Sequence, residues 1–324
     1  MSVLTPGKKA EKIDRLAELA AARTDEHGES LWREAFKRVR RNPAAIAGAV
    51  ILLLFVLVAI VGPFLVPYSP TDTVGIRNGE VASGAGRIPG PSAAHWLGYD
   101  HQGRDELSRM IVGSRQTLLV GVVSTLLGLV VGSFIGALAG AAYGLGGKWG
   151  QQLDNALMRF VDILLAMPSL LLAVSVAALL GASLTTVMIA VGVISVPIFA
   201  RLLRGSMIAQ ANSDYVLAAQ SLGVRRKRIA LSHVLPNSLG PVLVQATLTL
   251  ATAIIEAAAL SFLGLGNPNS ETPEWGVMLA DAQRYLDANF GLAVYPAIGI
   301  IVTALGFTLL GEAMREALDP KLRT

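Results

Sequence analysis

The sequence of 324 residues contains no cysteine. Disulfide bonds, iron–sulfur clusters and cysteine-ligated zinc are therefore excluded. The four histidines, His27, His95, His101 and His233, are dispersed along the chain, and none has the spacing of a metal-binding motif. We therefore predict that the chain binds no metal ion.

Charged residues are also scarce. They make up 15% of the chain, against about 25% in an ordinary soluble domain. Hydrophobic residues make up 53%, and the mean hydropathy is +0.55. The formal net charge of +4 is too small, and the basic residues are too scattered, to indicate nucleic-acid binding. This composition is typical of an integral membrane protein.

Long apolar runs predict an all-α membrane fold with six transmembrane helices. The first run begins only at Ala44 and is longer than the core of a signal peptide, so we expect it to remain as an anchor. At about 1.5 Å per residue it spans roughly 35 Å, enough to cross the hydrocarbon. The six runs cover residues 44–66, 116–143, 157–180, 184–203, 238–263 and 294–314.

The remaining segments complete the predicted organisation. They are an N-terminal segment at 1–43, an irregular external loop at 67–115, and a tail at 317–324, with a five-helix core at 116–316 that includes a hydrophilic loop at 204–237. Within the first segment, Leu31–Arg41 mixes aromatic and basic side chains. This pattern fits a basic amphipathic helix on an anionic membrane surface and, equally well, an ordinary basic flank of a membrane helix.

Basic residues predict the orientation of the chain. Ten of the 27 precede residue 44, six lie within 201–228, and three lie at the C-terminal end. Five of the six on the other side lie in the long loop 67–115, where the positive-inside rule has less weight. We therefore expect both termini and the hydrophilic loop to be cytoplasmic.

The second apolar run contains four glycines at an unbroken spacing of four residues: Gly128, Gly132, Gly136 and Gly140. This spacing places them on one face of a helix, where the absence of side chains lets another helix approach closely. We predict helix packing at this stripe, with a glycine hinge for gating as the alternative.

Residues 212–236, which we call the elbow, interrupt the apolar sequence with polar and basic residues. A short helix with one small apolar face is predicted from residues at helical spacing. These residues are Tyr215, Ala218, Ala219 and Leu222. That face is too small to form a core by itself. The elbow is therefore expected to meet a partner protein.

Several residues mark the ends of the elbow's helices. Asn212 or Ser213 is suited to cap the first helix, and Asp214 in its first turn is favoured by the helix dipole. Gly223 is placed to end it in a left-handed conformation. A second short helix is expected to run to Pro236.

Two acidic residues, Asp162 and Glu256, lie well within apolar runs. Acids are costly in hydrocarbon, so both are expected to face the bundle interior or a wet cavity. They are candidate residues of a substrate pathway. For Glu256, a structural hydrogen bond between helices is an equally good interpretation.

Catalytic and nucleotide-binding motifs are missing from the sequence. Gly147-Lys148 is the one candidate phosphate-binding loop, and it fails because Trp149 replaces the magnesium-binding Ser or Thr and Ala142 replaces the first glycine. His233 has no nucleophile or second acid beside it, so a hydrogen bond that fixes the elbow is expected there instead of catalysis. We predict that the chain is not an enzyme and binds no cofactor.

The elbow resembles the EAA loop of permease subunits of bacterial ATP-binding-cassette importers. The similarity lies in Leu217-Ala218-Ala219, Gly223, His233 and Leu235-Pro236-Asn237. Four further blocks look like the peptide branch of that family, and in particular its dipeptide permeases. They are HWLGYDHQGRDELSRMIVGSRQTLLVG (95–121), MRFVDILLAMPSLLLA (158–173), LSFLGLGNPNSETPEWGVML (260–279) and LLGEAMREALDPKL (309–322).

The resemblance implies a type I importer permease in the bacterial inner membrane. It also implies a second, similar permease, two cytoplasmic ATPases that bind ATP and magnesium, and an extracytoplasmic binding protein that delivers di- or oligopeptides. In the family the elbow is the coupling helix that docks on the ATPase. The residues it assigns to coupling are Asp214, Tyr215, Ala218, Ala219, Gly223, Arg225, Arg226, His233 and Pro236.

The sequence departs from the family pattern at two positions. Leu217 replaces the glutamate of the motif, which removes a possible salt bridge, so docking is expected to depend more on packing and on Arg225 or Arg226. Tyr99 stands where threonine is common. The alternatives are import of a nickel chelate, glutathione or another small solute by the same type of permease, and a proton-coupled secondary transporter that uses Glu256.

Overall fold

The computed structural model describes residues 37–81, 88–268 and 271–318. Within these ranges the regular secondary structure is helical, without a β-strand. Residues 1–36, which hold most of the predicted basic amphipathic helix, and residues 319–324 of the tail lie outside the described residues. The helices, in chain order, are α3 (Pro43–Leu65), α4 (Val74–Arg77), α5 (Glu106–Leu145), α6 (Gly147–Ala166), α7 (Ser169–Leu180), α8 (Leu184–Ala211), α9 (Asp214–Ser221), α10 (Arg226–Ile229), α11 (Leu235–Leu260), α12 (Trp275–Ala282) and α13 (Gly291–Leu318).

Five helical segments of the described chain are long and apolar enough to cross a membrane: α3, α5, α8, the run Arg226–Leu265 and α13. The all-α membrane class predicted from composition is thereby confirmed. The pair α6 and α7 is bent by 95°, and if it is one broken span the number becomes six.

The prediction of one helix over 157–180 was wrong. Pro168 breaks it, because proline has no N–H to donate and disfavours helical geometry in the preceding residue. Met167 accordingly has an extended backbone, with φ −86° and ψ 137°. Pro197, by contrast, lies inside α8 without ending it.

Two further boundaries differ from the sequence prediction. Helix α5 begins at Glu106 instead of residue 116, so the irregular loop is shorter than expected. The Asp105 side chain caps α5 by accepting a hydrogen bond from the Ser108 N–H at 2.8 Å. At the elbow, α10 continues through one π turn, Ala230–Val234, into α11, so no helix ends at Pro236.

The closest helix contact joins α5 to α8 through the glycine stripe. Gly128 lies against Ser195, Gly132 against Val196, Gly136 against Ala200, and Gly140 against Met207. A methyl group on any of the four would lie under 3.0 Å from its neighbour on α8. The four glycines of the stripe thus face α8, a helix of the same chain.

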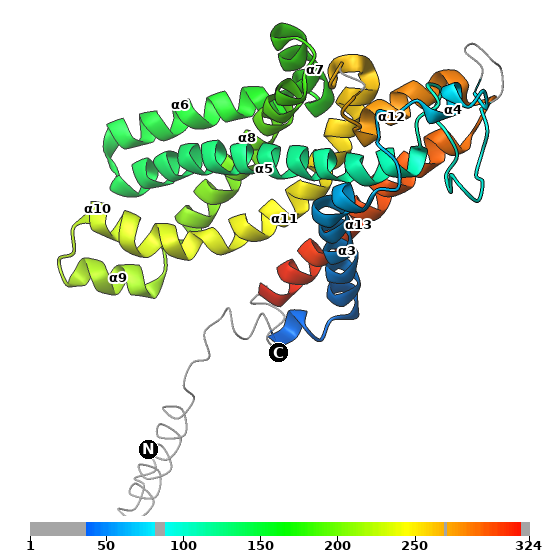
Figure 1. The fold of residues 1–324 in the computed structure, drawn as a ribbon. Coiled ribbons are helices and arrows are strands. Elements are labelled where there is room, and N and C mark those ends of the chain that lie inside the picture. Colours follow the sequence, from blue (N-terminus) through cyan, green and yellow to red (C-terminus); the bar gives the residue numbers. More distant parts are fainter. Residues whose placement is uncertain (1–36, 82–87, 269–270, 319–324) are drawn as a thin grey trace, which may run out of the picture.

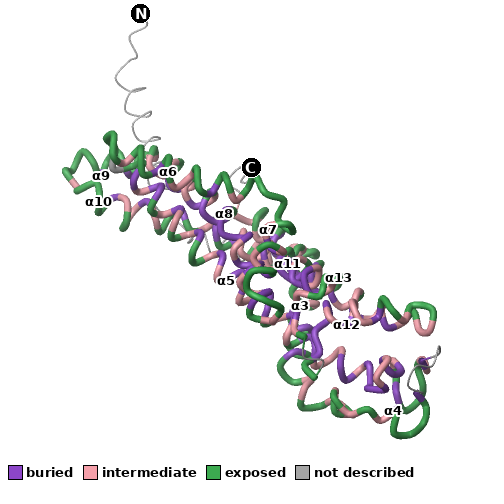
Figure 2. Tube along the Cα trace, turned by 90° about the horizontal axis from the view of Figure 1, so that it is seen from above, coloured by how far each residue is buried: buried purple, intermediate pink, exposed green. Residues whose placement is uncertain are grey.

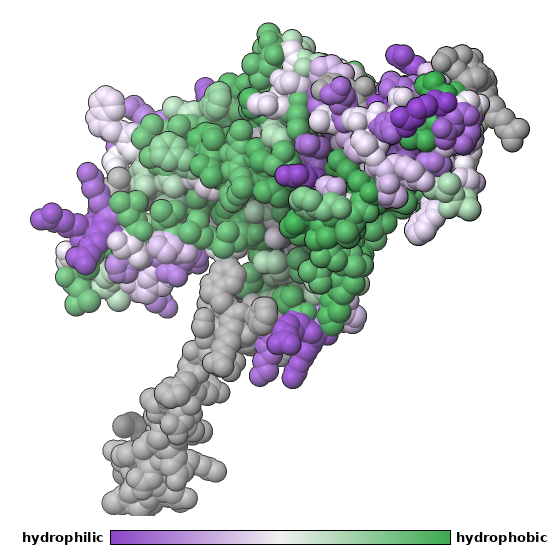
Figure 3. Space-filling view, viewed as in Figure 1, coloured by the Kyte–Doolittle hydropathy of each residue, from purple (hydrophilic) through white to green (hydrophobic). Residues whose placement is uncertain are grey.

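The molecule is elongated, with α5 and α11 running along much of its length and α6 and α8 in the part toward the elbow (Figure 1). The elbow, with α9 and α10, lies at one end, and α4 and α12 lie at the other. Buried residues follow the middle of the bundle in Figure 2. Apolar side chains cover the central part of the surface in Figure 3, and polar ones gather toward the two ends. This distribution suits a bundle that crosses a membrane.

We expect Gly136→Ala to destabilise the protein. The added methyl group would meet the Ala200 carbonyl group on α8, and overpacking of this kind costs about 1–3 kcal/mol. The measurement is the apparent melting temperature of the purified protein in detergent.

The matched control is Gly205→Ala, because a methyl group at this helical glycine of α8 meets nothing within 4 Å. That change should leave the melting temperature unchanged or raise it slightly. Equal melting temperatures for the two variants would contradict the packing role of Gly136.

Candidate functional site

The elbow begins with α9, whose two ends are set by different interactions. Asp214 lies in the first turn as predicted. The predicted side-chain cap was wrong: Ser213 Oγ donates to the Gln210 carbonyl oxygen at 2.6 Å, and Asn212 Nδ2 donates to that of Ile208 at 3.1 Å. Gly223 has φ +76°, which confirms the left-handed ending, and its N–H donates to the Gln220 carbonyl oxygen at 2.9 Å.

Helix α9 packs against the bundle mainly through residues outside the apolar face that was predicted to meet a partner, and most of that face remains exposed. Val216 and Ala219 are the buried residues, and they join a cluster with Met207 of α8 and Ile229 of α10. Of the predicted face, only Ala219 points inward. Val216, which the pattern left out, lies in an apolar cluster with residues of α8 and α11.

The outer face of α9 is exposed, and apolar side chains stand on it beside the polar residues Asp214 and Ser221. It carries Tyr215, Leu217, Ala218 and Leu222, and Leu222 is 84% exposed. Basic side chains follow directly in Arg225–Arg228, all of them exposed. An apolar surface bordered by positive charge is therefore available at this end of the molecule (Figure 3).

The second half of the elbow is part of a continuous helix. His233 lies in the π turn, where its carbonyl oxygen accepts from Asn237 Nδ2 at 2.7 Å. The expected hydrogen bond from the imidazole is not found: Nδ1 of His233 has no partner among the described residues. Pro236 occupies the first turn of α11, where its missing N–H breaks no bond within that helix.

The two predicted intramembrane acids contact different helices. Asp162 on α6 lies 2.5 Å from Arg201 on α8, and both side chains are more than half exposed. Glu256 on α11 is half-buried and has the Ser169 side chain, at the start of α7, as its hydrogen-bond partner. The contact of Glu256 fits the structural interpretation.

A second ion pair between α6 and α8 was not predicted. Asp154 is buried, and its two carboxylate oxygens accept from Arg204 Nε at 2.5 Å and Nη2 at 2.7 Å. Asp154 lies between the predicted runs 116–143 and 157–180, whereas α6 already begins at Gly147. The available signal was the presence of two acids, Asp154 and Asp162, in the segment before the two arginines Arg201 and Arg204.

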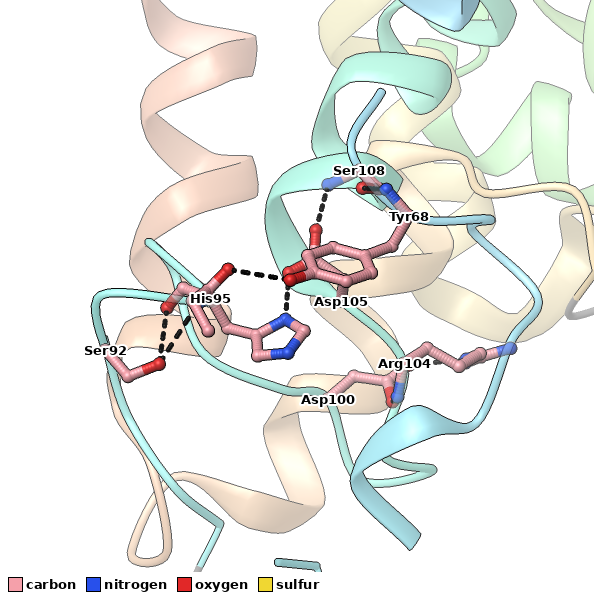
Figure 4. Close-up of polar contacts among 8 residues, drawn as sticks. Tyr68, Ser92, His95, Asp100, Arg104, Asp105 and Ser108 are labelled. Atoms are coloured by element: carbon pink, nitrogen blue, oxygen red, sulfur yellow. Dashed lines mark hydrogen bonds and ion pairs between the residues drawn. The ribbon is translucent and has the colours of Figure 1, made fainter. Parts of the chain in front are cut away.

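The loop before α5 is anchored by buried polar groups that were also missed. His95 Nδ1 lies 2.7 Å from Asp105 Oδ1 (Figure 4). The His95 ring packs against the rings of Tyr68 and Tyr99 at centroid distances of 4.4 and 4.3 Å. Burial raises the pKa of Tyr99 to about 12. Tyr99, a departure from the family pattern, is therefore a neutral core residue of this loop.

Asp100 completes this anchor. Its carboxylate accepts from Arg104 Nε at 2.6 Å and lies 3.3 Å from Arg109 Nε, and all three residues are buried. Arg104 and Arg109, which the orientation analysis counted as loop charges, thus carry a local structural role. They tie the loop to the first turns of α5.

The loop after α11 folds back onto the bundle. Ser261 Oγ donates to Glu274 Oε1 at 2.5 Å, and Trp275 Nε1 donates to the Met110 carbonyl oxygen on α5 at 2.9 Å. Burial raises the pKa of Glu274. This carboxyl group, expected only as a loop charge, fixes the start of α12.

Comparison with known families identifies the chain. Residues 128–324 match the family of binding-protein-dependent transport system inner membrane components, and residues 30–78 match the N-terminal transmembrane domain of oligopeptide transport permease C. The chain belongs to the binding-protein-dependent permease family. The resemblance seen in the elbow and the four sequence blocks is thereby confirmed.

Curated relatives agree over nearly the full length of this permease. A dipeptide transport system permease of Alkalihalophilus pseudofirmus is 40% identical over 295 residues, 91% of each chain. A glutathione transport system permease of Shigella flexneri is 40% identical over 292 residues, 90% of this chain and 91% of the relative.

Solved structures share the fold. A methionine ABC transporter in an inward-facing conformation superposes with a TM-score of 0.55 at 18% identity, covering 66% of this permease and 97% of that chain. An amino acid ABC transporter gives a TM-score of 0.50 at 17% identity, with 65% and 94% covered. The permease therefore has the core fold of these importers.

We expect Asp154→Asn to destabilise the permease strongly, because it leaves the Arg204 guanidinium without its carboxylate partner. Breaking a buried ion pair costs about 3 kcal/mol or more, whereas an exposed pair contributes less than about 1 kcal/mol. The matched control, Asp162→Asn, should therefore have a small effect. The measurement is the apparent melting temperature of each variant in detergent. Equal decreases for Asp154→Asn and Asp162→Asn would refute the difference between the buried and the exposed pair.

Proposed function

We propose that this chain is the membrane-spanning subunit of a bacterial ATP-driven importer of dipeptides and short oligopeptides. The observation that carries the proposal is the exposed apolar outer face of α9, at the end of a permease-family bundle. Such a face favours contact with a partner protein. The 40% identity to a dipeptide permease supports the substrate class.

A second candidate is import of glutathione by the same mechanism. It is favoured by the glutathione permease that is 40% identical over 90% of the chain. Peptides and glutathione share free carboxylate groups. The two candidates therefore differ in the solute delivered by the binding protein and agree in what this subunit does.

The proposed topology has six spans, with α6 and α7 counted together as one bent span. Both termini and the elbow lie in the cytoplasm, and α4 and α12 lie outside. The basic residues of the N-terminal segment and of Arg225–Arg228 support this direction. The location is the inner membrane, in agreement with the description of the family.

The proposed complex contains a second, similar permease, two ATPase subunits and an extracytoplasmic binding protein. This chain has no phosphate-binding loop of its own, so ATP and magnesium belong to the ATPases. It is a transport subunit without catalytic residues. It has no role in nucleic-acid binding.

Coupling follows from the way the elbow is built into the bundle. Val216 and Ala219 connect α9 to α8 through Met207, and the continuous run Arg226–Leu265 connects it to α11. The glycine stripe joins α8 closely to α5. Movement of the docked ATPases is therefore transmitted to three long helices, and it opens the path toward the binding protein.

The docking contact in this chain combines apolar area and positive charge. Leu217 is 54% exposed at the position of the family's glutamate. An apolar side chain there gains free energy by burial, at about 25 cal/mol per Å². Arg225 and Arg226 at the border of this face supply the charged contacts.

We expect Gly223→Pro to abolish ATP-dependent uptake while leaving the protein in the membrane. Proline requires a negative φ, whereas Gly223 has φ +76°, and proline also lacks the N–H that bonds to Gln220. Ala219→Glu should act in the same direction by placing a charge in the α9 packing cluster. Uptake and ATPase activity of the reconstituted importer measure the loss of coupling.

Gly240→Ala is the matched control, because a methyl group there meets nothing within 4 Å. It should retain uptake close to that of the unaltered importer. Normal uptake by both elbow variants would refute the coupling role.

The energy source separates the proposed importer from a proton-coupled transporter. We expect uptake in proteoliposomes to stop without ATP and to survive collapse of the proton gradient. Glu256→Ala tests whether this residue belongs to the pathway: reduced uptake supports that role, and unchanged uptake rejects it. Loss of uptake on collapse of the proton gradient would contradict the importer.

A further inference from the structure

One exposed face of α6 is polar in a chain that is otherwise apolar across the membrane. Asn155, Arg159 and Asp162 follow one another at spacings of four and three residues and therefore share a face. Together with Ala156 and Met158 they line an open surface hollow whose lining comes from α6 alone. The residues that pack α6 onto the bundle, Asp154 and Val161, lie on another face and are buried.

This polar face does not suit contact with lipid. Charged side chains within a membrane span are costly in hydrocarbon and are found facing water or other protein groups. Leu153 and Phe160, on the opposite side of α6, are exposed and apolar, as a lipid-facing surface requires. The two exposed sides of the helix are therefore adapted to different surroundings.

The two ion pairs between α6 and α8 differ in how far they are exposed. Asp154 is 3% exposed in its pair with Arg204, whereas Asp162 and Arg201 are 59% and 58% exposed. The buried pair fastens the helices together. The exposed pair uses Nη2 of Arg201 and one oxygen of Asp162, and of these two residues Asp162 lines the hollow.

Arg159 adds a positive charge beside the pair of Asp162 and Arg201. Among the described residues no salt bridge is found for Arg159, and Asp162 is already matched by Arg201. The formal charges of Arg159, Asp162 and Arg201 therefore sum to +1. A guanidinium group is suited to a carboxylate, to which it can donate two parallel hydrogen bonds.

We propose that this face of α6 lines the water-filled solute path and that Arg159, beside the Asp162–Arg201 pair, is a transient site for the carboxylate of the passing solute. The inference rests on the proposed function, which supplies a carboxylate-bearing peptide as the solute. It assigns a role in the path to Arg159, Asn155 and Arg201 beside Asp162. Asp162 acts as a positioning residue, because its contact holds Arg201 beside the hollow.

The absence of native cysteine allows a direct test of the lining. In the assembled transporter in proteoliposomes, Asn155→Cys is treated with small water-soluble methanethiosulfonate reagents, one anionic and one cationic, and modification of this 34.0 kDa chain is followed by mass shift. We expect it to react about tenfold faster than the matched control Leu153→Cys, which lies at nearly the same depth on the apolar side. Equal rates would overturn the proposal.

The charge of the site is tested with the same thiol. We expect the anionic reagent to be preferred at Asn155→Cys, the added change Arg159→Gln to reduce that preference severalfold, and Asp162→Asn to increase it. A preference that does not respond to Arg159→Gln would overturn the role of Arg159. A merely structural role of Arg159 would not move this ratio.

Solute recognition is tested by protection. With ATP and the binding protein present, dialanine should slow modification of Asn155→Cys at least threefold more than dialanine amide, which lacks the carboxylate. Equal protection would overturn the carboxylate site. The reactivity and charge tests do not require transport. If Asn155→Cys reacts and prefers the anionic reagent as expected but ATP-driven dialanine uptake fails, the proposed function is rejected and the charged lining remains supported.

Discussion

The close contact between α5 and α8 is the constraint on which the rest of the permease depends. Lipid supplies little hydrophobic force between helices, so association in a membrane relies on close packing. The glycine stripe of α5 brings its backbone against Val196 and Ala200 of α8. The position of α8 then determines where Arg201, Arg204 and the elbow lie.

Polar interactions arrange the remaining elements around this pair. Asp154 and Arg204 fasten α6 to α8, and the group of Asp100, Arg104 and Arg109 fastens the loop before α5 to that helix. Ionic contacts at these places are strong because their surroundings exclude water. The permease thus combines apolar close packing along its length with ion pairs at specific points.

The elbow serves two surfaces with one short helix. The inner residues Val216 and Ala219 join the bundle, and the outer residues, including Leu217 and Leu222, remain exposed. A helix of two turns can present both an inner and an outer surface, because residues three or four apart lie on the same side. In the proposed importer, this division would let the elbow move with an ATPase and still pull on α8 and α11.

The sequence by itself determined the helical membrane class, the packing role of the glycine stripe, and the start and end of α9 at Asp214 and Gly223. These features depend on composition, helical period and local backbone preference. Only the tertiary structure decided the 95° bend between α6 and α7, the Asp154–Arg204 pair and the inward face of α9. Each of these depends on which distant helix lies alongside, and local sequence patterns do not contain that information.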